Sequence, residues 1–270
     1  MLRSFSQRLR RFFDPSFPWL ERQAARKNCS LQALMDIDET NHWFPKEFRE
    51  RFGGFHPPGE SRDYQRVFAN DRVRSDMLAL LLREIVVARI PGSLAELGVH
   101  HGWSARLIHH YCPDRRFYLL DTFEGFAASD LKQESLGVGF NEQPAFNDTS
   151  IELVRKTIQP LGNTLEFVRG WFPTSVTAAM REDHFAFVHL DADLEAPIAA
   201  GLEFFWPRLT PGGMIVVHDY NAWPGARIAV DHFRQCQDAA AVPMPDKAGS
   251  IVLVKRPSHR SPSVPSTPPS

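Results

Sequence analysis

A glycine-bearing turn between an apolar strand and a helix constrains this chain most. The segment runs Leu94-Ala-Glu-Leu-Gly-Val-His-His-Gly-Trp-Ser104. Gly98 permits a sharp bend and a close backbone approach to a ligand, and Gly102 lets the following helix pack near the strand. Asp121 closes a second apolar run about 20 residues further on, the interval at which a neighbouring strand brings a carboxylate to a ribose. The pair predicts a nucleoside-binding α/β fold, and a tight turn without a ligand is the alternative.

The spacing of the glycines indicates the kind of nucleoside. A dinucleotide site shows G-x-G-x-x-G, which frees backbone amides at a helix N-terminus for a pyrophosphate. Here the spacing is G-x-x-x-G, and Glu96 stands two residues before the first glycine. A carboxylate there repels phosphate but can hydrogen-bond the positively charged amino end of S-adenosylmethionine. We therefore expect S-adenosylmethionine as the cofactor. The expected contact residues are Glu96, Gly98, Gly102, Ser104, Asp121 and Thr122.

The length and composition of the chain limit the classes of protein to which it can belong. A chain of 270 residues that is 43% hydrophobic can bury one full core plus appendages. Its net charge of -1 gives no global field to gather nucleic acid, so we expect no nucleic-acid partner. No run approaches the ~18 apolar residues that span a bilayer, and no signal peptide is evident, so a cytoplasmic protein is expected. Residues 1–13 carry apolar and arginine side chains at helical spacing, which favours an oligomer contact, with membrane-surface contact as the alternative.

The order of the chain predicts three parts. Residues 1–62 are expected to form a helical or irregular extension, a lid or oligomer arm, and residues 63–256 an α/β domain. Residues 257–270 consist almost entirely of Ser, Pro and Thr and are expected to be a disordered tail. Because strands and helices alternate in the domain, we expect a doubly wound, mostly parallel sheet with ligand sites at the carboxyl ends of its strands.

Periodicity and breaker residues place the individual elements. The expected strands are 94–98, 116–121, 164–168, 185–190, 214–217 and 250–255. One or two helices are expected within residues 63–88, followed by helices at 103–111, from a cap near Asp148 or Thr149 through Ile158, at 197–209 and at 225–237. A long loop over 124–148 has no periodicity, and loops of that length inside compact domains tend to be functional.

A second group of polar residues follows two of these strands. Asp191 and Asp193 come just after one strand, and His218 and Asp219 come just after the next, so all four are expected at the edge that holds the glycine turn. Crowded carboxylates favour a divalent metal, and Asp191 and Asp219 suit Mg²⁺. His218 either shifts the preference toward Mn²⁺ or Fe²⁺ or only orients the site. The alternative is that these aspartates cap a helix and a turn.

The two groups together predict a chemistry. Methyl transfer from a sulfonium to an alcohol needs the alcohol proton removed, and a metal bound to neighbouring hydroxyls lowers their pKa. Asp193 points the same way along the strand as Asp191 and is therefore the expected catalytic proton acceptor. His100 and His101 in the glycine turn are alternative bases, although each is more often a polar loop residue.

Several segments resemble one known family. They are Leu94 to Ser104, Asp121-Thr-Phe-Glu-Gly-Phe126, Gly170-Trp-Phe-Pro-Thr174, His189-Leu-Asp-Ala-Asp-Leu-Glu195, Pro207-Arg-Leu-Thr-Pro-Gly-Gly213, His218-Asp-Tyr220 and Pro224 to Phe233. Over roughly residues 70 to 255 they are similar to the macrocin-type (TylF-like) O-methyltransferases, class I S-adenosylmethionine-dependent enzymes that methylate sugar hydroxyls with a divalent metal. The resemblance implies a seven-stranded Rossmann-like sheet, a Mg²⁺ site at Asp191, His218 and Asp219, and a homo-oligomer whose N-terminal segments help close the site.

Two positions depart from the family pattern. The family usually has Asp-Asp-Tyr where this chain has His218-Asp219-Tyr220, which leaves the identity of the metal open. Glu195 replaces a tyrosine that often follows the metal ligand, which bears on the acceptor pocket. The expected function is methylation of a sugar or polyol hydroxyl of a glycoside or natural product. The alternatives are a catechol or phenol O-methyltransferase and a non-catalytic cofactor-binding subunit.

Overall fold

The computed structural model describes residues 71–126 and 146–256. The predictions for residues 1–62, for most of the loop at 124–148 and for the tail at 257–270 lie outside the described residues. Within the described residues, no helix combines the length and the apolar character that crossing a membrane requires.

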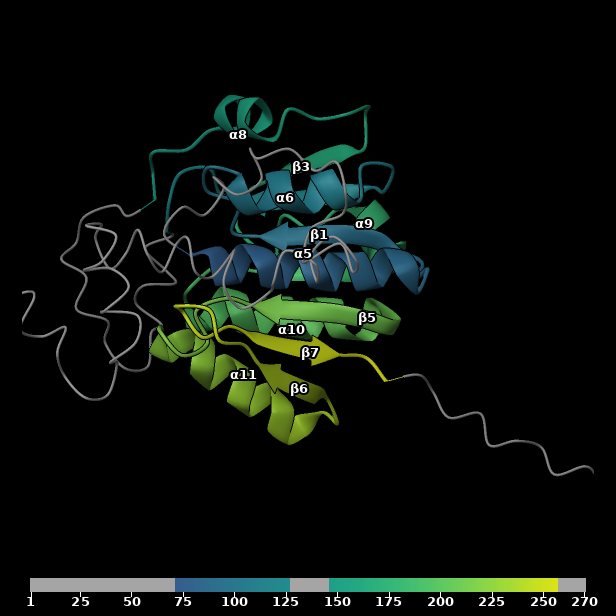
Figure 1. Ribbon diagram of the computed structural model, residues 1–270. Helices are drawn as coiled ribbons and strands as arrows, with labels where there is room; N and C mark the ends of the chain where they lie inside the picture. Colours follow the sequence, from purple (N-terminus) through teal and green to yellow (C-terminus); the bar gives the residue numbers. More distant parts are fainter. Residues whose placement is uncertain (1–70, 127–145, 257–270) are drawn as a thin grey trace, which may run out of the picture. The chain divides into compact units, whose positions relative to one another are not determined.

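A seven-stranded sheet forms the centre of the fold, as predicted (Figure 1). Its strands are β1 (Ser93–Leu97), β2 (Phe117–Asp121), β3 (Leu165–Arg169), β4 (Phe185–Leu190), β5 (Leu209–Val217), β6 (Ala240–Pro243) and β7 (Ile251–Val254). They lie in the order β3-β2-β1-β4-β5-β7-β6. The first five are parallel, and β7 runs antiparallel to both β5 and β6. In Figure 1 the arrowheads of β1 and β5 point to one side and that of β7 to the other.

Helices cover both faces of the sheet, so the fold is doubly wound. The described helices are α5 (Arg72–Val87), α6 (Trp103–Tyr111), α8 (Ile151–Ile158), α9 (Ala178–Glu182), α10 (Glu195–Arg208) and α11 (Pro224–Cys236). One core cluster joins the sheet to α5, α6 and α8, and the other joins it to α9, α10 and α11. In β2, Tyr118 and Leu120 belong to one cluster while Phe117 and Leu119 belong to the other. In the sequence, strands that are buried on both faces appear as continuous runs of apolar residues, without the alternation of apolar and polar residues that one exposed face produces.

Several element boundaries differ from the predictions. Ser150, rather than Asp148 or Thr149, caps α8, because its side chain accepts a hydrogen bond of 3.1 Å from the Leu153 amide. The strand predicted at 214–217 begins earlier, at Leu209, and β5 therefore includes the Pro211-Gly212-Gly213 segment, which a register irregularity after Phe185 accommodates. The helix predicted from Pro197 begins at Glu195. The short elements β6 and α9 were not predicted, since four or five residues carry too little periodicity.

Backbone hydrogen bonds bring the carboxyl ends of the central strands together. The Gly98 amide donates to the carbonyl of Leu120, and the Asp191 amide donates to the carbonyl of Leu97. The residue that follows β1 and the one that follows β4 are therefore each held by a carbonyl at the carboxyl end of the neighbouring strand. This arrangement fixes, on one edge of the sheet, the starting points of every turn that forms the site.

Candidate functional site

A cavity of about 290 Å³ opens at the carboxyl ends of β1, β2, β4 and β5. Its polar lining comes from the turns after those strands and from one helical residue, Arg74 of α5. The residues predicted for the site that line the cavity are Gly98, His100, Asp121, Thr122, Asp191, Asp193, His218 and Asp219. The two groups of residues that the sequence placed at one edge of the sheet therefore share one cavity.

The two glycines of the turn are required by contacts within the chain. Gly98 has φ +86°, and a Cβ on it would lie 2.1 Å from the carbonyl oxygen of Asp191. Gly102 has φ +79°, and a Cβ on it would lie 2.9 Å from a methyl carbon of Val154 in α8. The close approach predicted for Gly98 is thus made to the turn after β4. Gly102 permits packing against α8, whereas packing against the strand was expected.

Asp121 holds the glycine turn through its carboxylate. Its Oδ2 accepts hydrogen bonds from the amides of Val99 (2.7 Å) and His100 (2.9 Å), and its Oδ1 accepts one from the amide of Phe123 (2.7 Å). Beside it, the Thr122 hydroxyl donates to the Gly125 carbonyl at 2.7 Å. Both residues line the cavity, so Asp121 is positioned to meet a ligand while it fixes the turn.

Glu96 lies away from the cavity surface. It is completely buried, and its Oε1 lies 2.8 Å from Nδ1 of His189, the residue beside it in the register of β1 and β4. Burial raises the pKa of the Glu96 carboxyl, while His189 and the nearby Ser104 hydroxyl favour the charged form. Glu96, Gly102 and Ser104 are not among the lining residues. A direct cofactor contact by these three stays a prediction that this geometry does not favour.

The three predicted metal ligands converge on one point. Nδ1 of His218 lies 2.8 Å from Oδ1 of Asp191 and 2.8 Å from Oδ2 of Asp219. Arg74 donates a hydrogen bond of 2.6 Å to the other oxygen of Asp191. Burial opposes ionisation of Asp191, but Arg74 and His218 hold the pKa of its carboxyl well below the usual range. Burial also disfavours a charged His218, yet the two aspartates raise the pKa of His218 to about 10.

Asp193 differs electrostatically from Asp191. It is buried, has φ +59°, and its side chain hydrogen-bonds with Asp219. Burial and the neighbouring carboxylates of Asp191 and Asp219 raise the pKa of Asp193 well above its usual range. The alternative role as helix caps is not realised, because Leu194 is the N-cap of α10 and makes no side-chain cap bond. One aspartate is therefore held ionised and the other favours its proton.

Sequence reasoning missed Arg74 and the aromatic wall. Arg74 lies on the buried side of α5 with Met77 and Leu78, so a charged residue at the start of an apolar helical stripe was the available signal. The rings of Phe126 and Phe146 lie 5.0 Å apart between centroids, edge to face. The aromatic residues that line the cavity are Phe126, Phe146, Trp171, Phe172 and Trp223. They come from four separate turns, so no local pattern joins them.

Comparisons with known proteins show which family the chain resembles. A family model described as Macrocin-O-methyltransferase (TylF) matches residues 63–249. The 8-demethyl-8-(2,3-dimethoxy-alpha-L-rhamnosyl)-tetracenomycin-C 4'-O-methyltransferase of Streptomyces olivaceus is 30% identical over 171 residues, covering 60% of this chain and 65% of that protein. The chain thus spans less than two thirds of the length of that relative.

Two further comparisons give a relative and a fold. Demethyldecarbamoylnovobiocin O-methyltransferase of Streptomyces niveus is 25% identical over 177 residues, covering 62% of this chain and 67% of that protein. The solved structure of the O-methyltransferase NovP matches with a TM-score of 0.58 at 23% identity, covering 69% of this chain and 81% of that one. The structural match shows a shared Rossmann-like fold.

Proposed function

Because the chain belongs to the macrocin O-methyltransferase (TylF) family, we propose that it transfers a methyl group from S-adenosylmethionine to a hydroxyl of a sugar-bearing small molecule, assisted by a divalent metal. One observation carries the proposal: Asp191, whose pKa is held low, and Asp193, whose pKa is raised, line the same cavity as Gly98 and Asp121. A donor held at the glycine turn and an acceptor held at the aspartates can then meet in one enclosed space.

The cofactor half of the cavity consists of the turns after β1 and β2. Gly98 and Asp121 line this half, and Asp121 supplies a carboxylate at the position where neighbouring strands bind a ribose. Trp171, which follows β3, offers an exposed aromatic face at the same cavity. These groups suit the ribose and the flat base of a nucleoside.

The donor atoms at the other half fit a metal ion. Adjacent ligands of an octahedral ion with bonds of about 2.1 Å lie about 3 Å apart, and His218 Nδ1 lies 2.8 Å from an oxygen of each aspartate. Nδ1 of His218 faces the two aspartates, and on the far side of the imidazole Nε2 lies 4.0 Å from Oδ2 of the buried Asp246, a charge contact beyond hydrogen-bond distance. Asp191, His218 and Asp219 would hold the ion, which is Mg²⁺ or, because of the imidazole, Mn²⁺ or Fe²⁺. When bound, the ion lowers the pKa of acceptor hydroxyls.

Asp193 receives the proton in this proposal. Asp193 must be ionised to act as a base, and the positive charge of an ion at the neighbouring ligands would favour that form. Because its surroundings raise its pKa, the ionised carboxylate is a stronger base than an ordinary aspartate, which suits removal of a proton from an alcohol. As the acceptor oxygen bonds to the methyl carbon, the carbon–sulfur bond breaks. The products are a methyl ether and S-adenosylhomocysteine, and the proton stays on Asp193. The aromatic wall at Phe126, Phe146 and Trp223 can pack against the apolar face of a sugar ring.

Methyl transfer from labelled S-adenosylmethionine tests the proposal on the full chain. The acceptors are a panel of rhamnosides and other glycosides, the sugars that the names of the relatives suggest, with a catechol panel beside them. We expect label in glycosides, loss of transfer in EDTA and recovery with Mg²⁺ or Mn²⁺. Asp193→Asn should lower the turnover by about 10²–10⁴-fold, the usual contribution of a general base.

A matched control and the contrary outcomes complete this test. Asp238→Asn changes an exposed carboxylate outside the cavity lining and should leave turnover unchanged. Transfer to catechols alone would replace the sugar acceptor by a phenol. Full activity in EDTA would remove the metal from the proposal. Binding of S-adenosylhomocysteine with no transfer to either panel would favour a non-catalytic subunit.

A further inference from the structure

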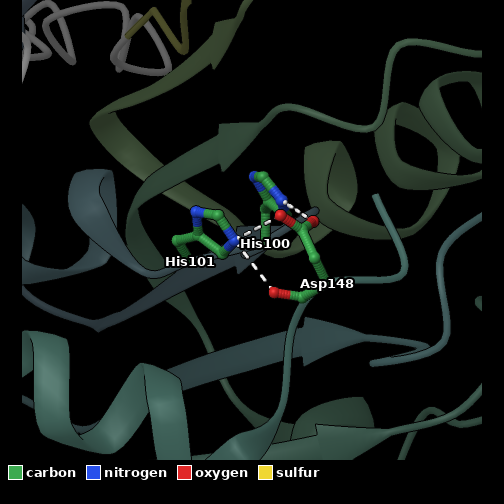
Figure 2. Close-up of side chains that lie close together, drawn as sticks. All are labelled: His100, His101 and Asp148. Carbon is green, nitrogen blue, oxygen red and sulfur yellow. Dashed lines mark hydrogen bonds and ion pairs between the residues drawn. The ribbon is translucent and has the colours of Figure 1, made fainter. Parts of the chain in front are cut away.

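A second cluster of ligand-type side chains lies at the rim of the cavity. His100 and His101 come from the turn before α6, and Asp148 comes from the segment before α8. Figure 2 shows the two imidazoles close to the carboxylate of Asp148. Nε2 of His100 lies 2.8 Å from Oδ1 of Asp148, and Nε2 of His101 lies 3.1 Å from its Oδ2. Each imidazole thus faces Asp148 with its Nε2 atom, and the two Nε2 atoms contact different oxygens of that carboxylate.

We propose that His100, His101 and Asp148 bind a divalent transition-metal ion of the zinc class. The proposal concerns a site separate from Asp191, His218 and Asp219, and it does not depend on the proposed function.

The spacing of the donor atoms supports the site. With metal–ligand bonds of about 2.0–2.2 Å, neighbouring ligands of one ion lie about 3 Å apart, close to the 2.8 Å and 3.1 Å between each Nε2 and the carboxylate. The main-chain oxygen of Asp148 lies 2.9 Å from Nε2 of His101 and adds a further oxygen nearby. An ion would replace the protons that now lie between these atoms.

The types of donor select the metal. Two imidazoles and one carboxylate favour Zn²⁺, Ni²⁺ or Cu²⁺ over Mg²⁺, which prefers oxygen ligands. The side chains of His100, His101 and Asp148 are 37%, 30% and 68% exposed, so an ion can enter and water can complete its coordination. The rings of the two histidines stack with centroids 3.7 Å apart, and the Nε2 atom of each contacts Asp148.

The site joins two segments that lie far apart in sequence. The Thr149 hydroxyl already donates a hydrogen bond to the carbonyl of His100. The ring of Phe146 lies 5.1 Å from that of His100, edge to face, and both residues line the cavity. An ion bound to both histidines and Asp148 would add a crosslink to these contacts. It should therefore hold the segment with Phe146, which lines the cavity, in place beside the glycine turn.

Calorimetric titration of the full chain with ZnCl₂ tests the site through two variants. His101→Asn removes one imidazole, and Asp148→Asn removes the exposed carboxylate without disturbing a buried group. We expect each variant to lose one zinc-binding event per chain or to bind that ion at least tenfold more weakly. His110→Asn is the matched control, because His110 is an exposed histidine of α6, the helix that follows the turn with His100 and His101; it should titrate like the wild type.

A third variant and a second measurement separate this site from the proposed catalytic one. The variant Asp191→Asn should still bind the zinc ion whose binding is lost in His101→Asn, whether or not the variant still transfers methyl groups. Zinc should also slow hydrogen exchange of the amides at 149–150 in the wild type and leave it unchanged in His101→Asn. Wild-type zinc titration by both His101→Asn and Asp148→Asn would overturn the proposal, as would equal exchange with and without zinc in the wild type.

Discussion

Arg74 donates a hydrogen bond of 2.6 Å to Asp191, a residue 117 positions away in the chain. The guanidinium stands at the start of α5, and the carboxylate follows β4. The pair supplies part of the positive charge that keeps Asp191 ionised. The other oxygen of Asp191 lies 2.8 Å from Nδ1 of His218, so Arg74 contacts the carboxylate on one side while its second oxygen faces the proposed metal ligands.

Arg74→Met should make the chain more dependent on metal. Without Arg74, the carboxylate of Asp191 loses a charged hydrogen bond, and the free energy of unfolding should fall by about 1–3 kcal/mol in EDTA. Added Mn²⁺ should raise the melting temperature of the variant more than that of the wild type. Arg83→Met on the same helix is the control, and it should respond to Mn²⁺ as the wild type does. Equal Mn²⁺ responses of Arg74→Met and the wild type would contradict this role.

The metal-free chain should lose stability as the pH rises from about 6.5 toward 10. The pKa of His218 is raised from 6.5 to about 10 in the folded state. The proton on His218 therefore stabilises the fold fully below 6.5, and this contribution is lost as the pH approaches 10. The slope should reach about 1.4 kcal/mol per pH unit, the value for one bound proton. Urea unfolding in EDTA measures it, and His218→Asn should flatten the curve. A wild-type stability that is constant or rises over this range would contradict the prediction.

Asp121→Ala should weaken binding of S-adenosylhomocysteine by about 1–3 kcal/mol, the cost of unpaired polar groups in a pocket. The substitution removes the acceptor for the amides of Val99 and His100. Calorimetry measures the affinity, and hydrogen exchange at these two amides should become faster in the same variant. Asp121→Asn keeps one acceptor oxygen and should lose less. Unchanged affinity in Asp121→Ala would remove this carboxylate from the cofactor site.

The buried pair of Glu96 and His189 should behave as a unit. Both side chains are fully buried and lie 2.8 Å apart. Replacing His189 alone by Phe leaves a buried carboxyl without its partner and should cost about 3–5 kcal/mol. Glu96→Leu combined with His189→Phe should recover much of that loss, as measured by urea unfolding. If the double variant were as unstable as the sum of the two single ones, the two side chains would not be coupled.

The sequence predicted the features that depend on local patterns, and it did not predict those that depend on contacts between residues far apart in the chain. The sheet edge that gathers Asp191, His218 and Asp219 was predictable, because apolar runs mark the strands and parallel strands end on one side. The burial of Glu96 was not, since it depends on His189 in a strand reached 93 positions later. The sequence predicted a close backbone approach at Gly98, but it could not show that this approach is to the carbonyl of Asp191, 93 residues later in the chain. The oligomeric state and the location in the cell stay predictions.

Single-turnover methyl transfer by Asp191→Asn tests the central claim most directly. The variant keeps the shape of the side chain but removes the charge that pairs with Arg74 and His218. With S-adenosylmethionine bound and a glycoside acceptor that the wild type methylates, we expect no transfer, while the affinity for S-adenosylhomocysteine stays within about twofold of the wild type. Transfer at the wild-type rate would contradict a shared cavity in which Asp191 holds the ion and the acceptor.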